Sequence, residues 1–198
     1  MINTVGKTQL VLTVFYECLC PDSKSFFIKH LLPSIVKVPQ FISAVLVPYG
    51  KAKTIMRQGE YRFTCQHGEV ECFGNKIHAC VIAKVQDVLI QVQIITCMIA
   101  DNIDPKEIGR KCCESHDVDW LPIQACALGI EGDALLKQHG DKTNSLVPRV
   151  TFIPTVLING NRGNQAAILK NLWKELCREV CMWHPPSTKY IDVVGIAL

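Results

Sequence analysis

The chain has 198 residues, 48% of them hydrophobic, and a formal net charge of +3 at neutral pH. This length is enough to bury one substantial core and too short for two comfortable domains. Because the charges are nearly balanced and form no basic run, the composition argues against nucleic-acid binding. No stretch of about 18 uncharged apolar residues occurs, so we expect no membrane-spanning segment.

The cysteine content indicates an oxidising compartment. Eleven cysteines are present, and so many thiols would be a liability in a reducing cytosol. The odd number leaves at least one thiol without an intramolecular partner. The apolar run 10–16 lacks a cationic lead-in and a small-residue cleavage site, so we interpret it as a strand and not as a secretory leader. We therefore expect that a leader has been removed or that this start site is not the native one.

The first part of the chain predicts a strand–helix–strand unit. Residues 9–17 are β-branched and aromatic without a breaker, which is typical of a buried strand. Pro21 suits the first turn of the helix that follows, and Pro33 is expected to kink or end it. A second strand is predicted at 41–47, and such a unit favours a right-handed parallel crossover. We expect the basic residues that come next to form a solvated loop: Lys51, Lys53 and Arg57.

From about residue 72 to 145 the pattern is helical, and strand character returns only near residue 150. We predict helices at 77–99, 105–116, 132–139 and 165–180, and a strand at 150–159 with Pro154 inside it and Asn159-Gly160 as a turn. The expected fold class is therefore α/β, one domain over residues 1–183 that is split by a helical insertion at about 65–145. Residues 184–198 are expected to form a loosely ordered tail.

Cys65, Cys72 and Cys80 lie seven and eight residues apart, with a histidine and two glutamates between the first two. A structural zinc ribbon uses two Cys-x-x-Cys pairs, which this spacing does not match. We therefore expect a segment fastened by disulfide bonds, with a metal site built from these cysteines, His67 and His78 as the alternative. The candidates for structural disulfides are Cys65, Cys72, Cys80, Cys97, Cys113 and Cys126.

The pairing of these cysteines cannot be deduced from one sequence. Cys112 and Cys113 are neighbours, and we expect only one of the two to be bridged to a cysteine elsewhere. Cys177 and Cys181 lie one helical turn apart, a spacing at which a disulfide bond is possible but uncommon.

Cys20 follows the first predicted strand and immediately precedes a helix. The free amides and partial positive charge of a helix N-terminus stabilise a thiolate over a thiol, so this position favours a reactive cysteine. A partner three residues further on would share its helical face, and that residue is Ser23. A cis-proline loop at Pro154 would face Cys20 and pair with an extended substrate. The alternatives are a structural Cys20, half-buried or bonded to Cys18, and an ordinary trans proline on an edge strand.

Three segments together carry a resemblance to a known family: the run Tyr16-Glu17-Cys18-Leu19-Cys20-Pro21-Asp22-Ser23, the Cys65–Cys80 signature, and residues 151–160. Over roughly residues 9–181 the chain resembles the gamma-interferon-inducible lysosomal thiol reductase family, especially its insect-type members. The resemblance implies a thioredoxin-like fold with a helical insertion. It also implies reduction of disulfide-containing proteins in a lysosomal, endosomal or secreted setting, and a role in immune handling of antigens or pathogens.

The same resemblance implies that Cys20 is the attacking thiol, that no metal or organic cofactor takes part, and that an external thiol such as cysteine or glutathione is the reductant. Ser23 stands where better-known members carry a second, resolving cysteine. A lone thiolate forms a mixed disulfide with its substrate but cannot release itself through a serine. In addition, the carboxylate of Asp22 lies beside Cys20 and disfavours its thiolate.

Three outcomes follow from this substitution. External thiol completes the cycle, Cys18 acts as an improvised resolving thiol, or the protein has lost turnover and only binds its partners. The leading hypothesis is a thiol oxidoreductase that uses Cys20 as nucleophile. The alternative is a catalytically lapsed, disulfide-rich binding protein that keeps the scaffold.

Overall fold

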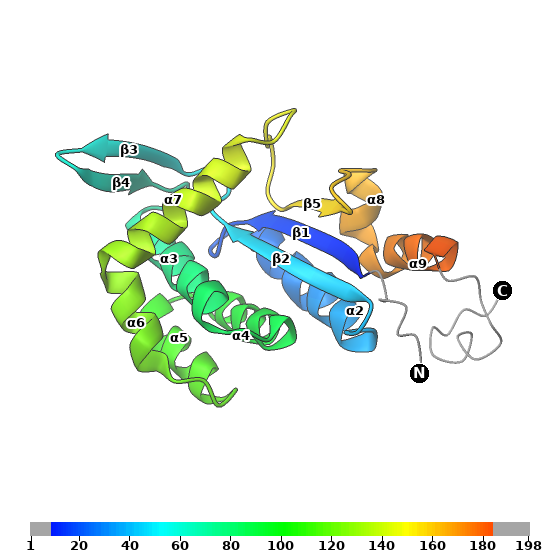
Figure 1. Cartoon of the computed structure of the whole chain (residues 1–198), viewed down its shortest axis with the longest axis horizontal. Helices are drawn as coiled ribbons and strands as arrows, with labels where there is room; N and C mark the ends of the chain where they lie inside the picture. The colour runs from blue at the N-terminus through cyan, green and yellow to red at the C-terminus, as the bar shows by residue number, and fades with distance from the viewer. Residues whose placement is uncertain (1–8, 184–198) are drawn as a thin grey trace, which may run out of the picture.

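A computed structural model describes residues 9–183, with side chains described as far as residue 179. Its centre is a three-stranded sheet of β1 (Leu10–Tyr16), β2 (Ile42–Pro48) and β5 (Thr155–Ile158), in the order β2-β1-β5 (Figure 1). β1 pairs with β2 in parallel and with β5 in antiparallel orientation. The α/β class and the parallel pairing of the first two strands are therefore confirmed.

A continuous helical run connects β1 to β2. It consists of α1 (Pro21–Phe26), the π-helical segment η1 (Phe27–Leu31) and α2 (Leu32–Lys37). Pro33 lies in the first turn of α2 and does not end the run. Because proline has no amide hydrogen, the segment before it adopts the wider hydrogen bonding of a π-helix, and the helix then continues.

Five helices lie between β4 and β5: α3 (Glu69–Lys84), α4 (Val88–Ala100), α5 (Pro105–Glu114), α6 (Trp120–Leu128) and α7 (Ile130–Asn144). They form the helical insertion that the sequence predicted. The insertion packs against the central sheet through contacts of α3, α4 and α7 with β2. One of its helices, α3, also reaches the loop that follows β1, because Asn75 accepts a hydrogen bond from the amide of Cys18.

The single helix predicted at 77–99 is wrong, because the chain breaks between α3 and α4. The carboxylate of Asp87 accepts hydrogen bonds from the amides of Leu89 and Ile90 and so begins a new helix. Aspartates cap the next two helices in the same way. Two further predictions were wrong: no helix was expected where α6 lies, and α7 extends well beyond the predicted 132–139.

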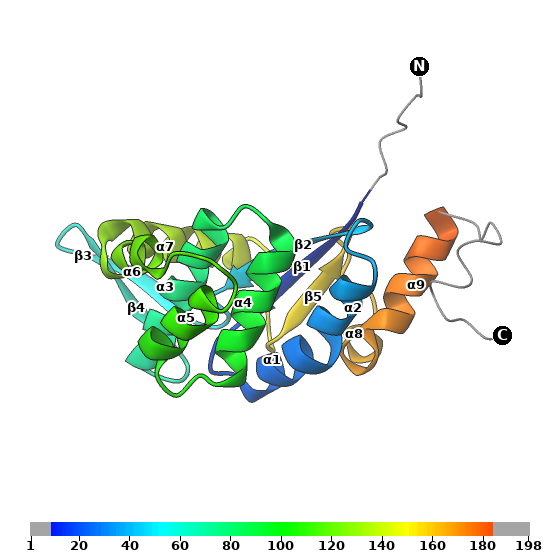
Figure 2. The same cartoon turned by 90° about the horizontal axis from the view of Figure 1, so that it is seen from below.

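Side chains of β1 alternate between the two faces of the sheet, as the two-residue period of a strand requires. Leu12, Val14 and Tyr16 lie in the main core, whereas Phe15 belongs to a smaller apolar cluster with Val47 on the opposite face. Figure 2 shows α1, α2 and α4 lying over the face that carries the main core. Strand β1 is thus buried on both sides and supports the loop that follows it.

The strand predicted at 150–159 is too long, since β5 begins only after Pro154. The residues before it have no regular structure. The predicted turn at Asn159-Gly160 is present, and both residues have positive φ values of 49° and 78°, as a type I′ turn requires.

The helix predicted at 165–180 is divided into α8 (Gln165–Lys170) and α9 (Leu172–Trp183). Asn171 leaves the helical conformation, and its side chain accepts a hydrogen bond from the amide of Lys174, which restarts the helix. The predicted tail 184–198 lies outside the described residues. Within residues 9–183, none of the helices combines the length and apolar character needed to span a membrane.

The basic segment expected to be a loop is part of a β-hairpin, formed by β3 (Lys53–Arg57) and β4 (Glu60–Thr64). Gln58 and Gly59 make the two-residue turn with φ values of 52° and 81°, both positive as in a type I′ hairpin. The hairpin packs against α7 and lies at the end of the molecule opposite α9 (Figure 1). Lys53 and Arg57 are exposed, so only the solvation part of the prediction holds.

Candidate active site

Cys20 stands where the loop after β1 meets α1. It is the N-cap residue of that helix, with an extended backbone (φ −67°, ψ 122°) and Pro21 as the first helical residue. The residue is 8% exposed, and its Sγ lies 3.7 Å from the backbone oxygen of Ile153. The thiol therefore faces the segment before β5, next to amides at the start of a helix that stabilise negative charge.

The segment that Cys20 faces also borders a pocket. The peptide bond between Ile153 and Pro154 is cis, and both residues are buried, whereas Phe152 beside them is 39% exposed. The pocket has a volume of about 190 Å³ and is lined by Asp22, Ser25, Phe26, His30, Phe152, Ile153, Pro154 and Leu169. Its walls therefore come from α1, from η1, from the segment before β5 and from α8.

Ser23 is fully buried in the first turn of α1. Its Oγ accepts a hydrogen bond of 3.4 Å from the backbone amide of Glu17. The hydroxyl therefore fastens the loop between β1 and α1. The position from which a resolving cysteine would act is thus occupied by a group that has a structural contact of its own and no redox chemistry.

Cys18 points away from Cys20. Its Sγ donates to the backbone oxygen of Glu71 on α3 at 3.4 Å, whereas Cys20 contacts Ile153. Both thiols are free. Burial, and secondarily the carboxylate of Glu71, raise the pKa of Cys18 well above its ordinary value. A thiol held in its protonated form is a poor nucleophile, so the geometry does not favour Cys18 as a resolving thiol.

Two asparagines of the insertion make hydrogen bonds to the backbone of Cys18. Asn75 Oδ1 accepts from its amide at 3.0 Å, and Asn102 Nδ2 donates to its carbonyl at 2.8 Å. Gly74 is required at this approach, because a Cβ there would lie 2.6 Å from Cys18 Sγ. These positioning residues were not predicted from the sequence. The signal was present in the four-residue spacing of Glu71 and Asn75, which puts both on one face of α3.

Three disulfide bonds are present among the described residues. They join Cys65 to Cys72, Cys80 to Cys126, and Cys97 to Cys112. The alternative of a metal site built from these cysteines with His67 and His78 is contradicted, because Cys65, Cys72 and Cys80 are in disulfides and a disulfide sulfur is not available as a thiolate ligand.

The prediction that Cys113 forms a structural disulfide is wrong. It is a free, buried thiol, and its neighbour Cys112 makes the bond to Cys97 instead, with a Cα–Cα distance of 5.8 Å. Successive residues on α5 point in different directions, so only one of the two can face α4. Burial is the main cause that raises the pKa of Cys113 to about 12. The side chain of Cys181 lies outside the described part, so the structure does not test the uncommon bond to Cys177.

The fold and this site define a class of protein. A central β-α-β unit, a helical insertion and a cysteine at a helix N-terminus facing the last strand segment are those of a thiol–disulfide oxidoreductase with a thioredoxin-like α/β fold. A family model described as "Gamma interferon inducible lysosomal thiol reductase (GILT)" matches residues 11–116. The chain belongs to the GILT family, as the sequence motifs predicted.

Relatives from several animals support this membership. A gamma-interferon-inducible lysosomal thiol reductase-like protein of Anopheles gambiae is 35% identical over 78% of this chain and 69% of its own length. GILT-like protein 1 of Drosophila melanogaster is 34% identical over 76% of this chain and 66% of its own length. The gamma-interferon-inducible lysosomal thiol reductase of Carassius auratus is 35% identical over 77% and 61%. This chain therefore spans about two thirds of the length of these relatives.

Among solved structures, the DsbA protein of Pseudomonas aeruginosa covers 90% of this chain and 90% of its own, with 12% identity and a TM-score of 0.49.

Proposed function

We propose that this chain reduces or exchanges protein disulfides as a monothiol oxidoreductase with Cys20 as its nucleophile. The observation that carries the proposal is the position of Cys20 Sγ, at the N-cap of α1 and 3.7 Å from the backbone oxygen of Ile153. Cys18 and Cys113 are also free thiols, and burial raises the pKa of both. Cys20 is thus the thiol best placed to react.

The steps of the reaction follow from the site having one reactive thiol, Cys20, and no resolving cysteine. The Cys20 thiolate attacks one sulfur of the substrate disulfide, which forms a mixed disulfide and releases the other substrate sulfur as a thiolate. An external low-molecular-weight thiolate then attacks Cys20 Sγ and releases the second substrate thiolate. A second external thiolate attacks the external sulfur, which regenerates Cys20 and yields the oxidised external disulfide. Ser23 takes no part in electron transfer.

The pocket beside Cys20 fits the residues that flank a substrate cysteine. Phe26, Phe152 and Leu169 supply apolar wall, and Asp22 and His30 supply polar groups at the same place. The backbone carbonyl of Ile153 faces Cys20 Sγ, so a substrate in extended conformation would place its main chain along this segment. We infer a preference for disulfides with an apolar side chain next to the attacked cysteine.

The compartment is inferred from the disulfides and from the relatives' names. Three disulfide bonds within one chain persist in an oxidising setting. The relatives from Carassius auratus and Mus musculus are named lysosomal thiol reductases. We propose an endosomal, lysosomal or secreted location for this chain.

A second candidate function is a binding protein without turnover. Its supporting observation is Ser23, whose buried hydroxyl contacts the amide of Glu17. Such a protein would capture substrates as mixed disulfides on Cys20 without releasing them efficiently.

Reduction of insulin in the presence of glutathione separates the two functions, with Cys20→Ser and Cys18→Ser as the paired variants. We expect turnover by the wild type and by Cys18→Ser, and only the background rate of glutathione with Cys20→Ser. Equal rates for wild type and Cys20→Ser would contradict the enzymatic proposal. Mass spectrometry that still finds a mixed disulfide on Cys20 would then support the binding function.

A further inference from the structure

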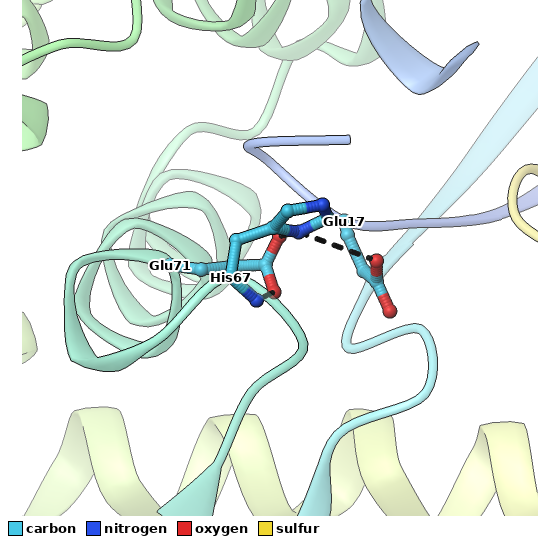
Figure 3. A group of neighbouring side chains, drawn as sticks. All are labelled: Glu17, His67 and Glu71. Carbon is cyan, nitrogen blue, oxygen red and sulfur yellow. Dashed lines mark hydrogen bonds and ion pairs between the residues drawn. The ribbon is translucent and has the colours of Figure 1, made fainter. Parts of the chain in front are cut away.

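Apart from the Cys20 site, Glu17, His67 and Glu71 bring three potential ligand atoms to one place (Figure 3). Two carboxylate oxygens and one imidazole nitrogen lie within 4.8 Å of one another. His67 Nδ1 is 2.6 Å from Oε2 of Glu71 and 3.8 Å from Oε2 of Glu17. The groups come from the loop after β1, the loop before α3 and the first turn of α3, so distant parts of the sequence converge here.

One oxygen of this cluster has no hydrogen-bond partner. Both carboxylate oxygens of Glu71 have a hydrogen-bond partner, because Oε1 accepts from the amide of His67 and Oε2 contacts the imidazole ring of His67. Oε1 of Glu17 accepts from the backbone amide of Lys51 at 2.6 Å. Oε2 of Glu17 is buried without a hydrogen-bond partner among the described residues, and it points toward His67 (Figure 3). The residue as a whole is 1% exposed.

The two carboxylates of this cluster are both buried, and the imidazole of His67 faces both of them. Carboxylates buried this close together are costly unless positive charge compensates them. Lys51 adds electrostatic attraction, but its contact with Glu17 is made by the backbone amide. A divalent cation would balance both carboxylates while a neutral imidazole supplies a third ligand atom.

We propose that Glu17, His67 and Glu71 form a binding site for a divalent transition-metal ion. Bonds of about 2.0–2.2 Å to oxygen and nitrogen place neighbouring ligand atoms roughly 3 Å apart, which lies between the 2.6 and 3.8 Å separations observed here. Carboxylate and imidazole ligands suit Mn²⁺ and Zn²⁺. The side chain of His67 is 33% exposed, so it provides a route of entry, and water completes the coordination.

A metal ion at this site would connect two parts of the chain that flank the reactive loop. Glu17 directly precedes Cys18, and the backbone oxygen of Glu71 itself accepts a hydrogen bond from the Cys18 thiol. The ion would therefore stabilise the fold around this loop without a ligand from Cys20. The inference does not depend on the proposed reductase activity.

Mn²⁺ is the first probe, because free thiols compete for softer metals such as Zn²⁺ much more than for Mn²⁺. Electron paramagnetic resonance of unbound Mn²⁺ would follow a titration of the full chain in thiol-free buffer, and a Zn²⁺ titration by calorimetry would follow. The variants are Glu17→Gln and His67→Gln, the second at a partly exposed position that does not threaten folding. The matched control is Glu69→Gln, an exposed glutamate in the same helical turn as Glu71.

We expect one saturable Mn²⁺ site per chain, with affinity reduced by more than about tenfold in both variants and unchanged in the control. Mn²⁺ should also raise the melting temperature of the wild type and of Glu69→Gln, but not of His67→Gln. Absence of saturable binding of either metal to the wild type would overturn the proposal. So would binding that is equal in the wild type, Glu17→Gln and His67→Gln.

Discussion

Asn75 on α3 holds the backbone of Cys18, because its Oδ1 accepts a hydrogen bond of 3.0 Å from the Cys18 amide. The two residues are 57 positions apart in the sequence, and both are buried. Cys18 lies two residues before Cys20 in the loop that delivers the reactive thiol to the start of α1. The helical insertion therefore positions the active-site loop as well as covering the sheet.

Replacement of Asn75 with alanine should destabilise the protein and lower its activity. The Cys18 amide would stay buried without an acceptor, which costs about 1–3 kcal/mol, and the loop that carries Cys20 would lose one of its attachments. Urea unfolding would measure the stability, and the rate of Cys20 alkylation by iodoacetamide would report on the loop. The exposed Asn144→Ala variant is the control and should change neither quantity. Unchanged stability in Asn75→Ala would contradict the anchoring role.

The elements that the sequence predicted best are those whose signals are local. The strand at 9–17, the helix after Pro21 and the turn at Asn159-Gly160 each depend on neighbouring residues, and each is present. The predicted helix at 77–99 failed where the hydrophobic pattern continued across a cap. Asp87 was a recognisable N-cap residue, but apolar residues on both sides of it outweighed that signal.

The parts that could not be predicted depend on contacts between distant residues. Five of the six cysteines bridged in the described structure were among the disulfide candidates. The sixth was predicted wrongly as Cys113 and not Cys112, because the choice depends on which side of α5 faces α4. The roles of Asn75 and Glu71 likewise need the docking of α3 against the Cys18 loop. The hairpin turn at 58–59 uses Gln-Gly, a weaker signal than Asn-Gly or Asp-Gly.

Introduction of a resolving cysteine by Ser23→Cys should change how turnover depends on external thiol. Residue 23 lies on the same face of the helix as residue 20, so the new thiol would attack the mixed disulfide within the same molecule. We expect reduction of insulin at limiting glutathione to increase several-fold, with a smaller gain when glutathione is abundant. When turnover is stopped, peptide mapping of this variant should find an intramolecular disulfide between residues 20 and 23.

The control for this variant is Ser25→Cys, which places a thiol at the edge of the pocket and off the face shared with Cys20. It should leave the dependence on glutathione unchanged. Loss of the Oγ contact to Glu17 will lower the stability of Ser23→Cys slightly, so rates must be compared well below the unfolding temperature. An equal response of both variants would argue against the alignment of residues 20 and 23.

Phe152 offers a test of the substrate pocket. It is a partly exposed aromatic side chain in the pocket beside Ile153 and Pro154, so Phe152→Ala removes apolar area that a substrate would cover. We expect kcat/KM for a peptide disulfide with a flanking apolar residue to fall by roughly tenfold, the effect of about 1.4 kcal/mol. A substrate with flanking glycines should lose much less. The control is Val147→Ala, at a residue that is 93% exposed. Equal losses of kcat/KM for both substrates in Phe152→Ala would refute the assignment of this pocket.

His78 should make the stability of the protein depend on pH. It is buried on α3, with Nδ1 3.1 Å from the Tyr16 hydroxyl, and burial lowers its pKa to about 3. The unfolded chain takes up a proton below about pH 6.5, while the folded chain excludes it down to about pH 3. The stability contributed by neutral His78 is therefore full above about pH 6.5 and is lost progressively as the pH falls toward 3.

His78→Gln keeps a polar partner for Tyr16 but cannot titrate. Between about pH 6.5 and pH 4.5 the wild type should lose roughly 2 kcal/mol more stability than this variant, since each pH unit contributes at most about 1.4 kcal/mol for one group. The quantity to measure is the change in urea unfolding free energy with pH, because the variant's stability at neutral pH is also altered by packing. The partly exposed His116→Gln should follow the wild type. Parallel curves for the wild type and His78→Gln would show that this histidine is protonated in the folded protein.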